Sequence, residues 1–203
     1  MIKIQKLIND KKFIYWTLNL KSRLMKKMII TIVFSLFVVT CVFGQQNVNL
    51  AVGMKAPDWM FTDADKKEFT MNSWAGMVLQ INYVDPDVSD LNDAFNDVVK
   101  KATDVDKTIS KDLFKGFGIV DCKSTWKPDF LIRMIAGNKA KKYDTTILFD
   151  YKATLQKEWG LPKDNYTVVI LDKNRICRAL YKGAIPESEN QKIVDLIIAL
   201  TKE

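Results

Sequence analysis

The chain has 203 residues, of which 48% are hydrophobic and 27% are charged, an ordinary composition for a globular protein. Its formal net charge of +7 would favour nucleic acid or an anionic membrane as a partner. Residues 1–44, however, hold eight basic side chains and one acidic side chain, so the remainder of the chain carries as many acidic as basic groups. The main part is therefore neutral overall, and no electrostatic argument for nucleic-acid binding remains.

The first 44 residues have the pattern of a secretory signal. Lys26 and Lys27 precede an apolar run over residues 28–43, which is shorter than the roughly 20 residues that a transmembrane helix needs. Val42 and Gly44 place small residues where a signal peptidase requires them, which predicts cleavage before Gln45. We therefore predict a signal peptide region over 1–44 and one domain over 45–203. The protein is expected to be periplasmic or secreted and to contact the membrane only transiently through the signal peptide.

Three alternatives concern the same segment. Met25, directly before Lys26 and Lys27, also has the context of a natural start, which would place residues 1–24 upstream of the true protein. The apolar run could remain as an uncleaved N-terminal anchor. Cys41 could carry a lipid, but Thr40 stands where a lipid-attachment site usually has Gly, Ala or Ser, so a lipoprotein is the less favoured reading.

The remainder of the chain alternates between strand and helix patterns. Strands are indicated by runs of apolar and β-branched residues, and helices by apolar residues at a 3.6-residue spacing. A tight hairpin before the last helix disfavours the wholly parallel sheet of flavodoxin-like folds, which alternate in a similar way. The predicted elements are a hairpin of 59–62 and 68–70, strand 78–84, helix 90–102, strand 117–122, helix 129–140, strand 145–149, helix 153–159, a hairpin of 166–171 and 176–181, and helix 186–202.

Several segments resemble the thioredoxin superfamily. Residues 52–58 (VGMKAPD) and 61–63 resemble the opening "VGxxAPDFxLxD" of peroxiredoxin-like and membrane-anchored thioredoxin-like proteins, and residues 166–173 resemble their "PTTFLIDKDG" hairpin. Residues 119–160, with the helix start Phe130-Leu131-Ile132-Arg133, are more similar to the YtfJ-type periplasmic family. The resemblance implies a thioredoxin-like α/β fold, in which helices flank a central mixed sheet, here with an N-terminal β-hairpin extension.

The resemblance fails at the position of the redox chemistry. In redox thioredoxins the first core strand ends in W-C-x-x-C, which places a low-pKa thiolate at a helix N-terminus. Here that strand runs into residues 83–90, which contain no cysteine, and Tyr166 stands where the superfamily has its cis-proline. Thiol exchange of the thioredoxin type is therefore not expected. We predict a non-catalytic binding or accessory protein of the cell envelope, whose partner is an envelope protein or a small ligand.

Two cysteines follow the predicted leader. Export favours a disulfide between Cys122 and Cys177. The thioredoxin core order 2-1-3-4 would place them on opposite outer strands, roughly 14 Å apart, whereas a disulfide needs Cα atoms within about 7 Å. We therefore expect two buried free thiols. The alternative function is a thiol oxidoreductase or peroxidase that uses Cys122, although the chain contains no histidine to activate it.

The segment after the first core strand is rich in acidic and polar side chains. Its D-x-D-x-S pattern begins like a calcium loop but lacks the glycine and the distant glutamate of that motif. Helix capping explains it better, so we predict no metal and no cofactor, and a calcium-dependent module remains a third hypothesis. Trp126 precedes a helix in a polar turn and could anchor a partner. The candidate binding residues are Asp85, Asp87, Ser89, Asp90, Trp126 and Tyr166.

Overall fold

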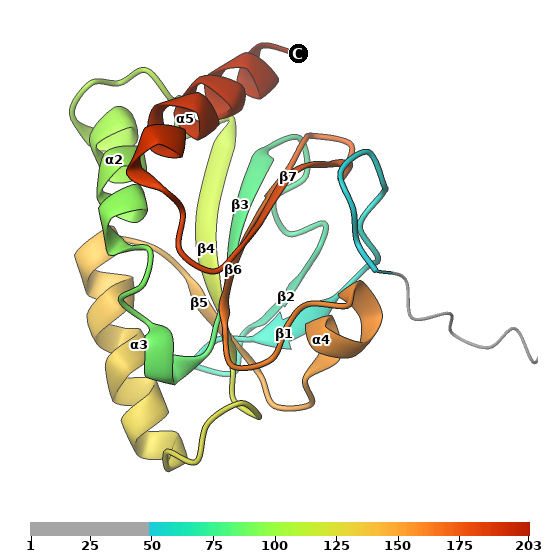
Figure 1. The fold of residues 1–203 in the computed structure, drawn as a ribbon, viewed down its shortest axis with the longest axis vertical. Helices are drawn as coiled ribbons and strands as arrows, with labels where there is room; N and C mark the ends of the chain where they lie inside the picture. Colours follow the sequence, from blue (N-terminus) through green and yellow to red (C-terminus); the bar gives the residue numbers. More distant parts are fainter. Residues whose placement is uncertain (1–48) are drawn as a thin grey trace, which may run out of the picture. The chain divides into compact units, whose positions relative to one another are not determined.

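The computed structural model describes residues 49–203 (Figure 1). The predicted signal peptide, the start at Met25, the cleavage before Gln45 and the lipid on Cys41 all lie outside these residues. Within residues 49–203, no helix has the length and apolar character needed to cross a membrane.

All predicted strands and helices are present, and their boundaries differ from the prediction by no more than three residues. Helix α2 begins three residues later than predicted, and the side chain of Asn92, just before it, bonds to the segment that precedes α5. The Asn92 amide donates to the Gly183 carbonyl and accepts from the Ile185 backbone N–H. The elements are β1 (Met60–Thr62), β2 (Glu68–Thr70), β3 (Val78–Val84), the short 3₁₀ helix η1 (Pro86–Val88), α2 (Asp93–Asp104), β4 (Phe114–Asp121), α3 (Asp129–Tyr143), β5 (Ile147–Asp150), α4 (Thr154–Trp159), β6 (Tyr166–Leu171), β7 (Cys177–Lys182) and α5 (Glu187–Lys202).

The seven strands form one mixed sheet in the order β2-β1-β5-β4-β3-β6-β7. Strands β3, β4 and β5 are parallel, and β6 and β7 run antiparallel to their neighbours. This arrangement confirms the thioredoxin-like fold with its N-terminal hairpin extension. One detail of the prediction was wrong: β4, which Cys122 follows, is not an outer strand. Strand β5 and the hairpin β1–β2 extend the sheet beyond it.

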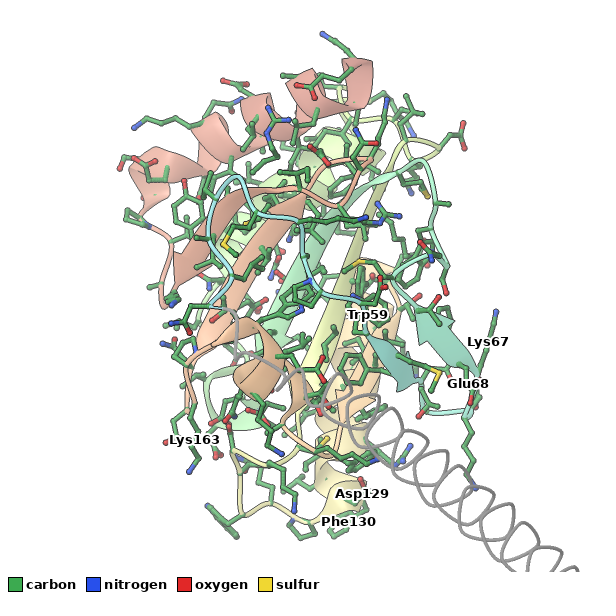
Figure 2. All side chains as sticks on the ribbon, turned by 90° about the vertical axis from the view of Figure 1, so that its right-hand side faces the viewer. Trp59, Lys67, Glu68, Asp129, Phe130 and Lys163 are labelled. Carbon is green, nitrogen blue, oxygen red and sulfur yellow. The ribbon has the colours of Figure 1, made fainter. Side chains whose placement is uncertain are left out.

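Helices cover the two faces of the sheet unequally. Figure 1 shows α2, α3 and α5 on one side of the sheet and α4 on the other. Because successive side chains of a strand point to opposite faces, each strand contributes to both layers. On the α4 face, Leu155 and Trp159 of that helix pack against the sheet and against Trp59, which is labelled in Figure 2. The opposite face packs apolar residues of α2 and α5 against the sheet.

A buried arginine fastens the turn between β6 and β7 to a distant loop. Arg175 is only 6% exposed, and its guanidinium donates hydrogen bonds to backbone carbonyl oxygens of the loop between β2 and β3. The acceptors are Met71 at 3.2 Å, Trp74 at 2.6 Å and Met77 at 2.8 Å. Burial lowers the pKa of this guanidinium. These bonds satisfy a charged group that would otherwise be costly to bury.

Candidate functional site

The end of β3 carries Asp85, at the position where the resemblance would place a redox cysteine pair. The Asp85 carboxylate accepts a hydrogen bond from the Asp87 backbone N–H at 2.7 Å and so caps η1. The side chain is buried. Burial, followed by the charges of Asp164 and Asp121, raises the pKa of this carboxyl to about 6. The capping interpretation is therefore confirmed for Asp85.

The other acidic residues of this segment pair with lysines that come from α3 and from the loop before it. Asp93 illustrates the pattern, since its carboxylate lies 2.5 Å from Lys139 Nζ and 3.0 Å from Lys142 Nζ. Although partial burial opposes it, these two lysines lower the pKa of Asp93. Lys139 also lies 2.6 Å from Asp90. Within residues 49–203, no three side chains of metal-ligating type come together.

Asp87 is engaged in the same way. Its carboxylate forms an ion pair with Lys127 and accepts a hydrogen bond from the Thr125 hydroxyl at 2.9 Å. Both partners lie in the loop that follows β4. Asp87 therefore links the end of β3 to this loop.

The two cysteines of the described domain are both free thiols, as predicted, but only Cys177 is buried, and Cys122 is partly exposed. Cys122 follows β4 directly, and its Sγ lies 3.6 Å from the Val120 carbonyl oxygen. Burial, and then the charges of Asp129 and Asp121, raise the pKa of the Cys122 thiol to about 12. Burial raises the pKa of Cys177 to about 11. Since the thiolate is the nucleophilic form, little of it is present on either cysteine at neutral pH.

A hollow of about 460 Å³ lies between α2, α3 and the facing side of β3 and β4. It extends from the η1 end of α2, where Ser89 and Tyr166 line it, to the opposite end of that helix, where Asp104 and Lys111 line it. Of the six predicted binding residues, only Ser89 and Tyr166 contribute to its lining. Asp85, Asp87, Asp90 and Trp126 lie outside it.

Two glycines leave the floor of this hollow open. Gly116 and Gly118 of β4 lie opposite Gln80 and Asn82 in the parallel pairing with β3. A Cβ on Gly116 would meet only Phe114 ring carbons, at 3.6 Å, and a Cβ on Gly118 would meet the nearest atom at 3.6 Å as well. A methyl side chain would therefore fit at both positions. Glycine within a strand often marks a place where another group approaches the backbone.

A chain of hydrogen bonds crosses the floor. The Gln80 Nε2 group donates to Asn82 Oδ1 at 3.2 Å and to Asn96 Oδ1 at 3.0 Å, and Asn96 Nδ2 donates to the Tyr166 hydroxyl oxygen at 2.9 Å. Gln80 is 2% exposed, yet its Oε1 atom has no hydrogen-bond partner among the described residues. An unpaired buried acceptor costs on the order of 1–3 kcal/mol. Among the described residues that line the hollow, the Tyr143 hydroxyl is also buried without a partner.

Sequence reasoning missed Gln80, Asn82, Gly116 and Gly118. The signal was present as a period of two: β3 reads VLQINYV, with amides at alternate positions, and the neighbouring strand reads FKGFGIVD, with glycines at alternate positions. Since side chains two residues apart share a face of a sheet, the two amides lie on one face of β3 and the two glycines lie on one face of β4. Only the pairing register shows that they lie opposite each other.

Trp126, whose role as an aromatic anchor stays a prediction, is 85% exposed, and Phe130 in the first turn of α3 is 73% exposed. Figure 2 labels Phe130 beside Asp129 at the end of the domain, away from Trp59. Met134, four residues further along α3, is also exposed. None of these three exposed apolar side chains lines the hollow.

No protein-family model matches the chain, and no curated protein matches it in sequence. Solved structures do resemble it in fold. The thioredoxin domain of a thiol-disulfide oxidoreductase from Bacteroides vulgatus is 10% identical over 73% of this chain and 99% of its own, with a TM-score of 0.53. The exposed lipoprotein thioredoxin of Streptococcus pneumoniae is 14% identical over 71% and 100%, with a TM-score of 0.51. The peroxidoxin BcpB of Mycobacterium tuberculosis is 12% identical over 75% and 97%, with a TM-score of 0.53. At these identities the likeness establishes the thioredoxin-like fold of the chain.

Proposed function

We propose that this chain is an exported thioredoxin-fold protein of the cell envelope that binds a ligand or partner and does not catalyse thiol–disulfide exchange. The observation that carries the proposal is the end of β3. There, Asp85 caps a turn and Asp87 pairs with Lys127 and Thr125, in place of a cysteine pair. A disulfide oxidoreductase needs a stabilised thiolate, and neither aspartate supplies a nucleophile of that kind.

The alternative, an oxidoreductase or peroxidase that uses Cys122, is less well supported. A catalytic thiol normally has a pKa lowered by a helix N-terminus or a nearby cation. Around Cys122, burial and the carboxylates of Asp129 and Asp121 act in the opposite direction. The thiol is thus poorly suited to attack a peroxide or a disulfide at neutral pH.

Reduction of insulin by dithiothreitol, followed by turbidity, tests this proposal directly. We expect the protein to leave the rate at the uncatalysed value, and the Cys122→Ser and Cys177→Ser variants to behave like the wild type. Alkylation by iodoacetamide at pH 7 should be slow for both thiols in the native protein and rapid in denaturant. A catalysed rate that Cys122→Ser abolishes and Cys177→Ser preserves would establish the alternative.

Export is the second part of the proposal, supported by the signal-like pattern of residues 1–44. The similar fold of an exposed lipoprotein thioredoxin is consistent with a location outside the cytoplasm. The intact mass of the protein, expressed with its own leader, distinguishes the possibilities. A mass that begins at Gln45 supports cleavage and release. A lipid-modified mass beginning at Cys41 would make it a lipoprotein, and an unprocessed mass would contradict cleavage.

The YtfJ-type periplasmic family is the proposed affiliation. Asp121 ends β4 and Phe130-Leu131-Ile132-Arg133 lies at the start of α3, which is the arrangement that the resemblance implies. An envelope protein is a second candidate partner, and the exposed Trp126 and Phe130 support it. Site-specific crosslinking from position 126, with the exposed Lys163 position as the control, tests that contact in cells.

A further inference from the structure

The hollow between α2, α3 and the sheet has a defined polar floor and apolar walls, which together specify a class of ligand. We infer that it binds a small, uncharged and mainly apolar molecule, which donates a hydrogen bond from an N–H or O–H group to Oε1 of Gln80. This inference rests on the proposed binding function and names the ligand class for it.

The hydrogen-bond donor follows from the orientation of Gln80. Its Nε2 group already donates to Asn82 at 3.2 Å and to Asn96 at 3.0 Å, so the amide is held in one orientation. Asn96 in turn donates to Tyr166 at 2.9 Å. The remaining Gln80 atom, Oε1, is buried and lacks a partner within residues 49–203, and Gln80 is one of the residues that line the hollow. Buried carbonyl oxygens of this kind are normally satisfied, so a donor from a molecule in the hollow completes the network.

The ligand is uncharged because the floor beside Gln80 carries no charged side chain, while the lysines at the two polar ends of the hollow already lie against carboxylates. At one end, Lys139 lies 2.5 Å from Asp93. At the other, Lys111 and Lys100 lie 2.7 Å and 2.6 Å from Asp104. The floor consists of amides and the Tyr166 phenol, which burial keeps protonated by raising its pKa. An ion placed there would lose its hydration without gaining a free counter-charge.

The walls make the ligand mainly apolar. A volume of about 460 Å³ falls within the range of small-molecule sites in proteins. Burial of apolar surface supplies the main driving force for binding in such a site, and a single polar contact fixes the orientation. The apolar lining residues that face this space include Val99, Phe114, Ile132, Ile135 and Ala136.

Two bicyclic probes of nearly the same shape test the inference. Indole carries one N–H donor, whereas benzofuran has a ring oxygen in its place and no donor. Isothermal titration of the purified protein should give a dissociation constant for indole at least about tenfold lower than for benzofuran, because only indole satisfies Gln80. Chemical shifts of the Gln80 and Asn96 side-chain amides should move with indole.

Three variants test whether the two probes bind in the hollow and whether Gln80 distinguishes them. Gln80→Met keeps the length of the side chain without the amide, so both probes should bind it with similar affinity. Gly118→Val places a β-branched side chain, which suits a strand, into the floor and should abolish binding of both probes. Gly137→Ala is the matched control, since a Cβ at that exposed α3 position meets nothing within 4 Å and both affinities should be unchanged.

Several results would overturn the inference: no measurable binding of indole, equal affinities for the two probes in the wild type, or wild-type affinity in Gly118→Val. The probe comparison in the wild type stands even if a variant fails to fold. Each of these results is separate from the insulin assay, because a protein that binds neither probe can still be inert in thiol exchange.

Discussion

The two faces of the central sheet are built from the same strands but filled in opposite ways. On the α4 face, β3 contributes Leu79, Ile81 and Tyr83, all fully buried against Trp159 and its neighbours. On the opposite face, the alternate residues Gln80 and Asn82 border the hollow. One strand thus supplies a close-packed core on one side and a polar floor on the other.

The two layers also differ in their aromatic packing. The α4 face includes stacked and tilted aromatic pairs, such as Trp59 with Phe61 at a centroid distance of 5.5 Å and Trp74 with Phe117 at 4.5 Å. Aromatic contacts of this kind add to the stabilisation from buried area. The opposite face is close-packed beneath α5 and part of α2, but opens at the hollow that Gly116 and Gly118 line. Stability and ligand binding are therefore expected to respond to different substitutions.

The largest expected effect is on the close-packed face. Trp159→Ala should lower the free energy of unfolding by about 3–5 kcal/mol, the usual cost of removing a buried tryptophan. The residue is 1% exposed, and its Nε1 donates to the Pro57 carbonyl at 3.1 Å. Urea unfolding measures this loss. Trp126→Ala, at an exposed position, is the matched control and should change stability by less than about 0.5 kcal/mol. Similar losses of unfolding free energy in the two variants would contradict the expected difference between the buried and the exposed tryptophan.

A smaller effect concerns Asp85, at the end of β3. Its folded pKa of about 6 lies above the ordinary value of 3.8, so the folded state holds this proton more tightly than the unfolded state. By linkage, protonation of Asp85 should raise the free energy of unfolding by about 1 kcal/mol as the pH falls from 7 to 5. This contribution is lost as the pH rises through 6.

Urea unfolding at pH 5 and pH 7 checks this dependence. The chain has no histidine, so the usual groups that titrate in this range are missing. In Asp85→Asn the increase in unfolding free energy between pH 7 and pH 5 should disappear. The amide oxygen of the asparagine can still accept the hydrogen bond from the Asp87 N–H. An unchanged pH dependence in the variant would assign the titration to another group.

The smallest expected effect is on the hollow face, and its sign is opposite to that at Trp159. Gly118→Ala should raise the free energy of unfolding by about 0.5–1 kcal/mol, because alanine restricts the unfolded chain and fits the space available. Gly183 provides the contrast. Its φ of 92° disfavours a side chain, so Gly183→Ala should destabilise the protein. Thermal unfolding of both variants measures the difference, and a loss of stability in Gly118→Ala would mean that the floor is already filled.

The fold was largely predictable from sequence because its signals are local. Alternating apolar residues define the strands, and the turn at residues 172–175 defines the final hairpin. The predicted separation of Cys122 and Cys177 also led to the right result, two free thiols. It did so although β4 is not an outer strand, because β3 and β6 still separate β4 from β7.

The site was predicted less completely, for a physical reason. The acidic residues after β3 were conspicuous in sequence, but Lys139 and Lys142, about 50 positions away, neutralise Asp93 through contacts that only the tertiary structure reveals. Conversely, Gln80 and Gly118 are unremarkable individually. They become a site only when parallel pairing brings their strands together beneath α2 and α3.

Arg175 has a consequence for which substitutions the protein can accept. Its acceptors in the loop between β2 and β3 are main-chain oxygens, which every amino acid possesses. These bonds therefore place no demand on residue type at positions 71, 74 and 77, where packing alone sets the choice. The arginine itself is far more constrained, since a lysine ammonium lacks the planar fork that reaches three carbonyls at once. Random mutagenesis with selection for folded protein should thus recover varied loop sequences, with arginine retained at position 175.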